Sequence, residues 1–123
     1  MYEIMSQPGE GLVRVAFTGF PEEVGTDPLR RDLADHIRLA KAGGASFDLL
    51  LDLRRASILP QSQIGGATGI LDELASQGLR RVAVLVGSML MKLQVRRIMA
   101  ASTAEIFGDE EEALIWLASQ SRI

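Results

Sequence analysis

The chain has 123 residues, of which 47% are hydrophobic and 24% charged, so it is long enough for one domain with one core, which we expect to span residues 1–123. The formal net charge of -3 argues against a general nucleic-acid binder, which usually presents a net basic face. The lack of cysteine excludes disulfides, thiolate catalysis and sulfur-ligated zinc, and a single histidine excludes a His-rich metal site.

The N-terminal segment predicts a β-hairpin. Residues 2–6 and 12–18 are candidate strands, and the turn between them contains Pro8 and Gly9. The second strand alternates, with Val13, Val15 and Phe17 on one face. No basic region followed by a long apolar run precedes it, so we expect no signal peptide and a cytoplasmic location. The longest apolar stretch, residues 82–91, is too short to insert into a membrane.

An amphipathic helix is predicted next. Thr26 or Asp27 is a suitable N-cap before Pro28, and Gly43-Gly44 ends the helix. The residues with helical spacing on its inward face are Leu29, Leu33, His36, Ile37 and Ala40. We expect His36 to be a half-buried structural residue, because no acid or nucleophile stands at a motif spacing from it.

The segment 47–53 is almost continuously apolar, which is typical of a strand covered on both faces. Asp52, at its end, is expected to accept hydrogen bonds from the backbone of a loop that begins at Arg54. A second helix then begins near Pro60, and its inward residues are expected to be Ile64, Ala67, Ile70 or Leu71, and Leu74. Glycines at 65, 66 and 69 weaken this helix, and the sequence favours close packing against the sheet as their purpose, with approach of a ligand as the alternative.

The last part of the chain repeats the alternation of strand and helix. After Gly78 come a strand at 82–86, a helix at 88–101, a short strand at 105–107 and a helix that Asp109 caps and Trp116 and Leu117 anchor. The helix at 88–101 has apolar residues on several sides, so it either buries two faces or forms a contact between two copies. A hairpin followed by strand–helix alternation predicts an α/β fold with a mixed, mostly parallel sheet and four helices.

Three segments carry a resemblance to a known family. They are the strand ending in Leu51-Asp52-Leu53, the strand 81–87, and the tail from Ile106-Phe107 to Trp116-Leu117. Together they resemble the STAS superfamily, in particular its SpoIIAA-like (STAS/SEC14-like) branch, over essentially the whole chain. The resemblance implies a STAS-like fold and a non-enzymatic regulatory module that binds a protein partner.

The regulatory serine motif of that family is not intact here. Anti-sigma-factor antagonists resembling this chain carry Asp-Ser-Ser-Gly at the start of the helix that follows the acidic strand, and one serine is phosphorylated. The corresponding residues here are Pro60-Gln61-Ser62-Gln63. Only Ser62 remains, one position late, so we expect a STAS-like module without the family's phospho-serine motif.

The candidate binding residues follow the strand that ends near Asp52. Open α/β folds bind ligands at the carboxyl ends of parallel strands, and arginines there can receive an anion or an acidic protein surface. This hypothesis selects Arg54, Arg55, Ser57 and Ser62. An alternative role for Asp52 as a phosphoryl acceptor lacks the acid pair and the lysine that such chemistry needs. No catalytic set, metal site or cofactor motif is recognisable, so the sequence predicts no enzyme.

Two further hypotheses concern the methionine-rich helix. Methionine adapts easily to an interface, so residues Met89–Met99 are a candidate homodimer contact. The same helix, with the SEC14-like resemblance, makes a binding protein for a small apolar, lipid-like ligand the alternative to the regulatory module.

Overall fold

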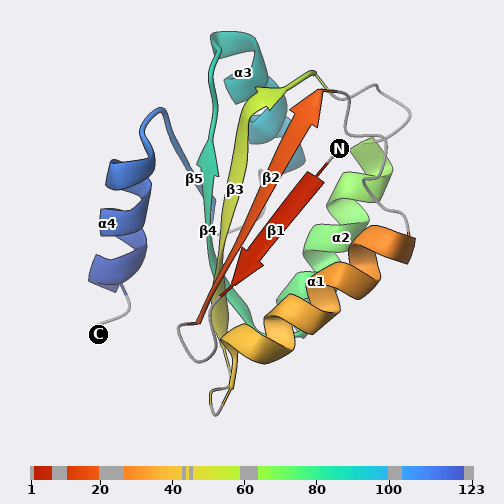
Figure 1. Ribbon diagram of the computed structural model, residues 1–123. Coiled ribbons are helices and arrows are strands. Elements are labelled where there is room, and N and C mark those ends of the chain that lie inside the picture. Colours follow the sequence, from red (N-terminus) through yellow and green to blue (C-terminus); the bar gives the residue numbers. More distant parts are fainter. Residues whose placement is uncertain are drawn as a thin grey trace.

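A computed structural model describes residues 2–6, 11–19, 27–42, 44, 46–58, 64–99 and 104–120 (Figure 1). Five strands form one sheet in the order β1-β2-β3-β4-β5. The strands are β1 (Tyr2–Ser6), β2 (Leu12–Gly19), β3 (Phe47–Ala56), β4 (Leu79–Leu85) and β5 (Ala104–Phe107). The helices are α1 (Asp27–Ala40), α2 (Ile64–Ser76), α3 (Met89–Ile98) and α4 (Glu110–Gln120). The predicted α/β class and element order are confirmed.

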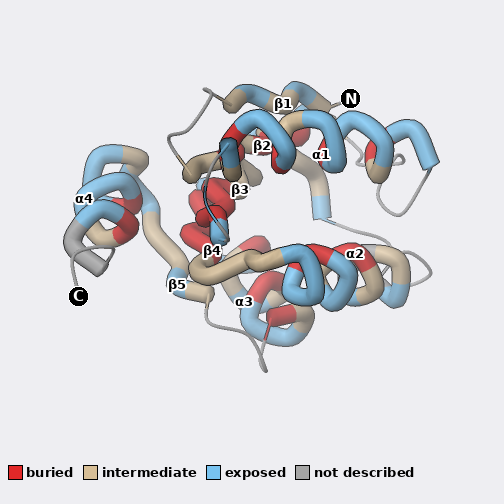
Figure 2. The backbone as a smooth tube through the Cα atoms, turned by 90° about the horizontal axis from the view of Figure 1, so that it is seen from below, coloured by how far each residue is buried: buried red, intermediate tan, exposed pale blue. Residues whose placement is uncertain are grey.

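Strand β1 pairs antiparallel with β2, and the other three pairings are parallel. Three helices lie on one face of the sheet and α4 lies alone on the other (Figure 2). Helix α1 packs on β1 and β2, α2 on β4 and α3, and α4 on β4 and β5. The carboxyl ends of all the parallel strands therefore meet at one edge of the sheet.

The side chains of β3 fill both layers, as its apolar run predicts. Phe47 and Leu49 join the core under α1, α2 and α3, while Leu50 joins the core under α4. The smaller α4 core consists of Leu50, Ala83, Leu85, Ala113 and Leu117. Alternation along one strand thus supplies two cores, because successive side chains of a strand point to opposite faces.

Several predicted contacts are confirmed. Val13, Val15 and Phe17 are buried on one face of β2. His36 is half-buried, and its Nδ1 shares a hydrogen bond of 2.6 Å with Ser6 Oγ. Helix α4 is anchored by Leu117 and by Trp116, whose ring centroid lies 5.6 Å from that of Phe107.

The predicted boundary of β3 is wrong. The strand continues to Ala56, so Arg54 and Arg55 belong to the strand and not to a loop. The extension exists because the end of β2 offers partners, with Thr18 opposite Arg55 and Gly19 opposite Ala56. A short stretch of sequence does not reveal a partner strand. Charged residues at the end of a strand therefore cannot be distinguished from those of a solvent-exposed loop.

Helix α3 buries one face and not two, and the predicted contact between two copies stays a prediction. It begins after Ser88, whose Oγ accepts a hydrogen bond of 3.1 Å from the Met91 backbone N–H, and it ends at Ile98. Met91 and Val95 are buried, whereas Met89 and Leu90 are exposed. No helix in the described part of the chain is both long enough and apolar enough to cross a membrane.

The predicted reason for the glycines of α2 is wrong at two positions. A Cβ placed on Gly65 or Gly69 would meet no atom of the described residues within 4 Å, so close packing does not explain either glycine. A close approach occurs instead at Gly87, after β4, where a Cβ would lie 3.0 Å from the Arg54 carbonyl oxygen. The glycine that a close backbone approach requires is therefore Gly87, at the carboxyl edge of the sheet, and not a glycine of α2.

Alanine at these glycines is expected to have opposite effects. Gly69→Ala should raise the free energy of unfolding by about 0.5–1 kcal/mol, because it removes backbone freedom from the unfolded chain without a clash. Gly87→Ala should lower it by about 1–3 kcal/mol, because the β3 backbone must move. Urea denaturation of the two variants measures both changes, and equal signs would contradict this account.

Candidate interaction surface at the carboxyl ends of the strands

The carboxyl edge of the sheet brings Arg54, Arg55 and Ser57 together with the beginnings of α3 and α4 (Figure 1). Strand β3 ends there with Arg54, Arg55 and Ala56, and Ser57 follows. Gly87 and Ser88 join β4 to α3 beside it. This edge is the place where an open parallel sheet usually binds its ligands.

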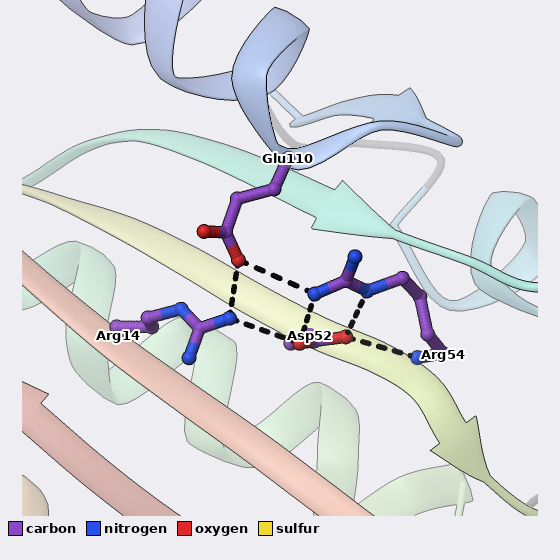
Figure 3. Close-up of polar contacts among 4 residues, drawn as sticks. All are labelled: Arg14, Asp52, Arg54 and Glu110. Carbon is purple, nitrogen blue, oxygen red and sulfur yellow. Dashed lines mark hydrogen bonds and ion pairs between the residues drawn. The ribbon is translucent and has the colours of Figure 1, made fainter.

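Asp52 is the centre of a polar network at this edge (Figure 3). Its Oδ1 accepts hydrogen bonds from the Arg54 backbone N–H at 3.1 Å and from Arg54 Nε at 3.0 Å. Its Oδ2 accepts from Arg54 Nη2 at 2.9 Å and from Arg14 Nη2 at 3.1 Å. The predicted backbone bond is thus confirmed, and both carboxylate oxygens are occupied by donors.

Glu110 completes this network from the first turn of α4. Its Oε1 accepts a hydrogen bond from Arg14 and lies 3.3 Å from Arg54 Nη2. Two arginines and two acids therefore join β2, β3 and α4, and we call Arg14, Asp52, Arg54 and Glu110 the ionic cluster. Its formal charges cancel, so it offers little net charge to an external ion.

The cluster favours the ionised form of Asp52. The side-chain hydrogen bond from Arg54 is the main reason that the pKa of Asp52 lies below its ordinary value of 3.8, and burial of the carboxyl opposes this shift. The same hydrogen bond raises the pKa of Arg54. An aspartate held by four donors is suited to fixing structure, which agrees with the structural role expected from the sequence.

The structure does not bring the predicted binding residues into one anion site. Arg54 lies on the α4 side in the ionic cluster, whereas Ser57 is half-buried and lines an apolar cavity on the side of α1, α2 and α3. Arg55 is exposed, and it forms no ion pair with another described residue. Ser62 lies outside the described residues. Both predicted arginines are exposed, and Arg55 is the one that lies outside the ionic cluster.

An exposed apolar surface lies on α3, close to where the helix begins. Met89, Leu90 and Leu93 are 68%, 65% and 49% exposed. Their spacing of three and four residues places them together along one side of the helix. We call these three residues the α3 patch. The sequence predicted this helix as a contact surface, but only the packing of Met91 and Val95 shows which side remains open.

The ionic cluster itself was not predicted. Arg14 and Asp52 are 38 positions apart in the chain, and Arg14 and Glu110 are 96 apart. The only available signal was the alternation of β2, which put Arg14 on the face opposite Val13 and Val15. Within the described ranges, no three His, Asp or Glu side chains gather closely enough to hold a metal ion.

No protein-family model matches the chain, and no curated protein matches it either. Some solved structures, however, are similar to this chain. An uncharacterised protein from Shewanella loihica, of the DUF3478 family with a SpoIIAA-like fold, matches with a TM-score of 0.65 and 15% identity over 95% of this chain and 92% of that one.

Two anti-sigma factor antagonists are similar as well. Unphosphorylated SpoIIAA gives a TM-score of 0.62 with 20% identity over 97% of each chain. An antagonist from Mycobacterium paratuberculosis gives 0.58 with 12% identity, covering 96% of this chain and 95% of that one. The chain therefore has a SpoIIAA-like fold, as its sequence predicted.

Replacement of Asp52 by Asn should destabilise the protein at neutral pH by about 1–3 kcal/mol, because the arginines lose their charged partner. The folded-state pKa of Asp52 is lowered, so its contribution is complete above 3.8 and is lost as pH falls through the lower folded-state value. The difference in urea midpoint between wild type and Asp52→Asn should therefore shrink below that pH. Asp72→Asn, at an exposed position of α2, is the control, and a difference that stays constant down to pH 2 would contradict the assignment.

Proposed function

We propose that this SpoIIAA-like domain is a non-enzymatic regulatory module that binds a protein partner through the α3 patch and Arg55. The single observation that carries this proposal is the exposure of Met89 and Leu90, at 68% and 65%, on a helix that begins at the carboxyl edge of the sheet. Adjacent exposed apolar side chains on one helix face are typical of a surface that another protein covers.

The charges near the α3 patch suggest what kind of partner it fits. Arg96 and Arg97 are exposed in the last turn of α3, and Arg55 is exposed at the end of β3. An apolar centre with a basic border is complementary to a protein surface with apolar contacts and acidic residues around them. The partner we infer is therefore a protein with an acidic rim, and a second copy of this chain is an outcome that the experiments below can detect.

The similar structures support a protein partner without assigning one. Two of them are anti-sigma factor antagonists, a role directed at another protein. Fold alone does not transfer that role, since one fold supports many functions. The positions of the family's phospho-serine motif, 60–63, lie outside the described residues, and their sequence still predicts a module without an intact phospho-serine motif.

The α3 patch can be tested with matched variants. Leu90→Glu should abolish capture of a stoichiometric protein partner from extract of the native organism, because it places a charge in the apolar centre of the contact. Ile115→Glu is the control, since Ile115 is 62% exposed on α4, on the other face of the sheet. Capture that survives Leu90→Glu would contradict the proposal. Sedimentation velocity of both variants also measures their oligomeric state. A dimer that is present in Ile115→Glu and lost in Leu90→Glu would identify the partner as a second copy.

Alanine variants of Arg54 and Arg55 should distinguish a residue that stabilises the fold from one that binds the partner. Arg55→Ala should weaken capture of the same partner by about tenfold, the cost of about 1.4 kcal/mol, while leaving the urea midpoint unchanged. Arg54→Ala should lower the urea midpoint, because it leaves Asp52 with fewer donors. An unchanged affinity in Arg55→Ala would remove Arg55 from the binding surface. An unchanged midpoint in Arg54→Ala would contradict the structural role of the cluster.

A further inference from the structure

An apolar cavity lies over the middle strand of the sheet, on the face that carries α1, α2 and α3. The contacts of these helices with the sheet are concentrated on β1, β2 and β4, so the centre of β3 receives no helix of its own (Figure 2). Leu33 of α1, Leu71 of α2 and Ile98 of α3 line the space together with Leu51 and Leu53 of β3. The cavity has a volume of about 100 Å³.

The cavity is not sealed by the protein. Leu51 and Leu53 stand in the central strand, where full burial is expected, yet both are only half-buried. Leu71 and Ile98 are half-buried as well, on the helices opposite. Large aliphatic side chains around one space thus keep contact with the exterior, although a protein core normally packs closely enough to exclude it.

The lining defines the chemistry of an occupant. Ser57 and Gln94 are the polar residues among those that line the cavity, and none of the described lining residues carries a charge. A charged group inside such a lining would lose its hydration without gaining a partner. Two methionines, Met91 and Met99, can adjust their shape to a guest. The part of a ligand that enters must therefore be neutral and apolar.

The volume limits the size of that ligand. An engineered apolar cavity of about 150 Å³ binds benzene, so this cavity suits a guest of at most about one six-membered ring or a short branched alkyl group. The chains of a membrane lipid are much larger. The part of a ligand that lies inside the cavity is therefore no larger than such a group, and a molecule of that size is the one the cavity holds whole.

We infer that the cavity over β3 is a binding site for a compact, neutral, apolar small molecule such as a ring or a short branched alkyl group. The site is separate from the α3 patch, because Met91 and Val95 of α3, which line the cavity, lie on the buried side of that helix. It therefore does not depend on the protein partner proposed above, and either proposal can fail alone.

The NMR signals of the methionine methyl groups can show whether a ligand binds in this cavity. Benzene is the probe, added to protein carrying ¹³C-methyl methionine and followed by two-dimensional NMR. Met91 and Met99 line the cavity, whereas Met5 and Met89 are 52% and 68% exposed elsewhere. We expect saturable shifts of Met91 and Met99 with one dissociation constant, and no saturable shift of Met5 or Met89. Benzoate, which has the same ring with a charge, should produce no such shift.

Filling variants locate the site. Leu53→Phe places a ring in the cavity and should weaken benzene binding at least about tenfold. Leu114→Phe is the matched control, because Leu114 is 38% exposed on α4, and it should bind like wild type. Ile98→Phe fills the cavity from α3 and serves if Leu53→Phe does not fold.

Each remaining result overturns the inference. No saturable shift in wild type up to the solubility of benzene would show that the cavity does not bind apolar guests. Binding unchanged in Leu53→Phe and Ile98→Phe would place the guest elsewhere. Shifts of Met89 alone would assign benzene to the α3 patch instead.

Discussion

The carboxylate of Asp52 is the contact on which the carboxyl edge of this fold depends. It lies in a strand whose first four residues are buried, and it takes hydrogen bonds from β2 and β3 while Glu110 of α4 shares its two arginines. An arginine that lost this acid would remain partly buried without its partner, which is costly. The ionic cluster therefore joins α4 to β2 and β3 and holds the Arg54 guanidinium against Asp52.

The two faces of the sheet are covered unequally. On one face α4 completes a small core around Leu50 and Leu85. On the other face lie three helices, and none of them packs mainly on β3. The cavity over Leu51 and Leu53 is the consequence, because helices that pack on neighbouring strands leave the strand between them to be covered by side chains alone. The fold thus leaves an apolar space over β3.

A shared fold does not by itself transfer the function of an anti-sigma factor antagonist. The family's phospho-serine positions carry other residues here, while the exposed side of α3 and Arg55 offer contacts of a different kind. Function is carried by such sites and varies among proteins that share an architecture. A partner of this chain would be recognised by apolar contact and basic charge, and a small ligand by shape and the absence of charge.

The sequence by itself determined the order of elements, the inward faces of β2 and α1, and the double burial of β3, because these follow from local periodicity. It also predicted a structural role for Asp52, whereas its prediction of a contact surface on α3 stays a prediction. Only the tertiary structure decided that β3 continues through Arg54 and Arg55 and that Arg54 pairs with Asp52. It also decided that Gly65 and Gly69 have open space beside them among the described residues, and that Arg55 forms no ion pair with these residues. Those facts depend on strand pairing and on partners as far as 96 positions apart, which leave no periodic signal in a single chain.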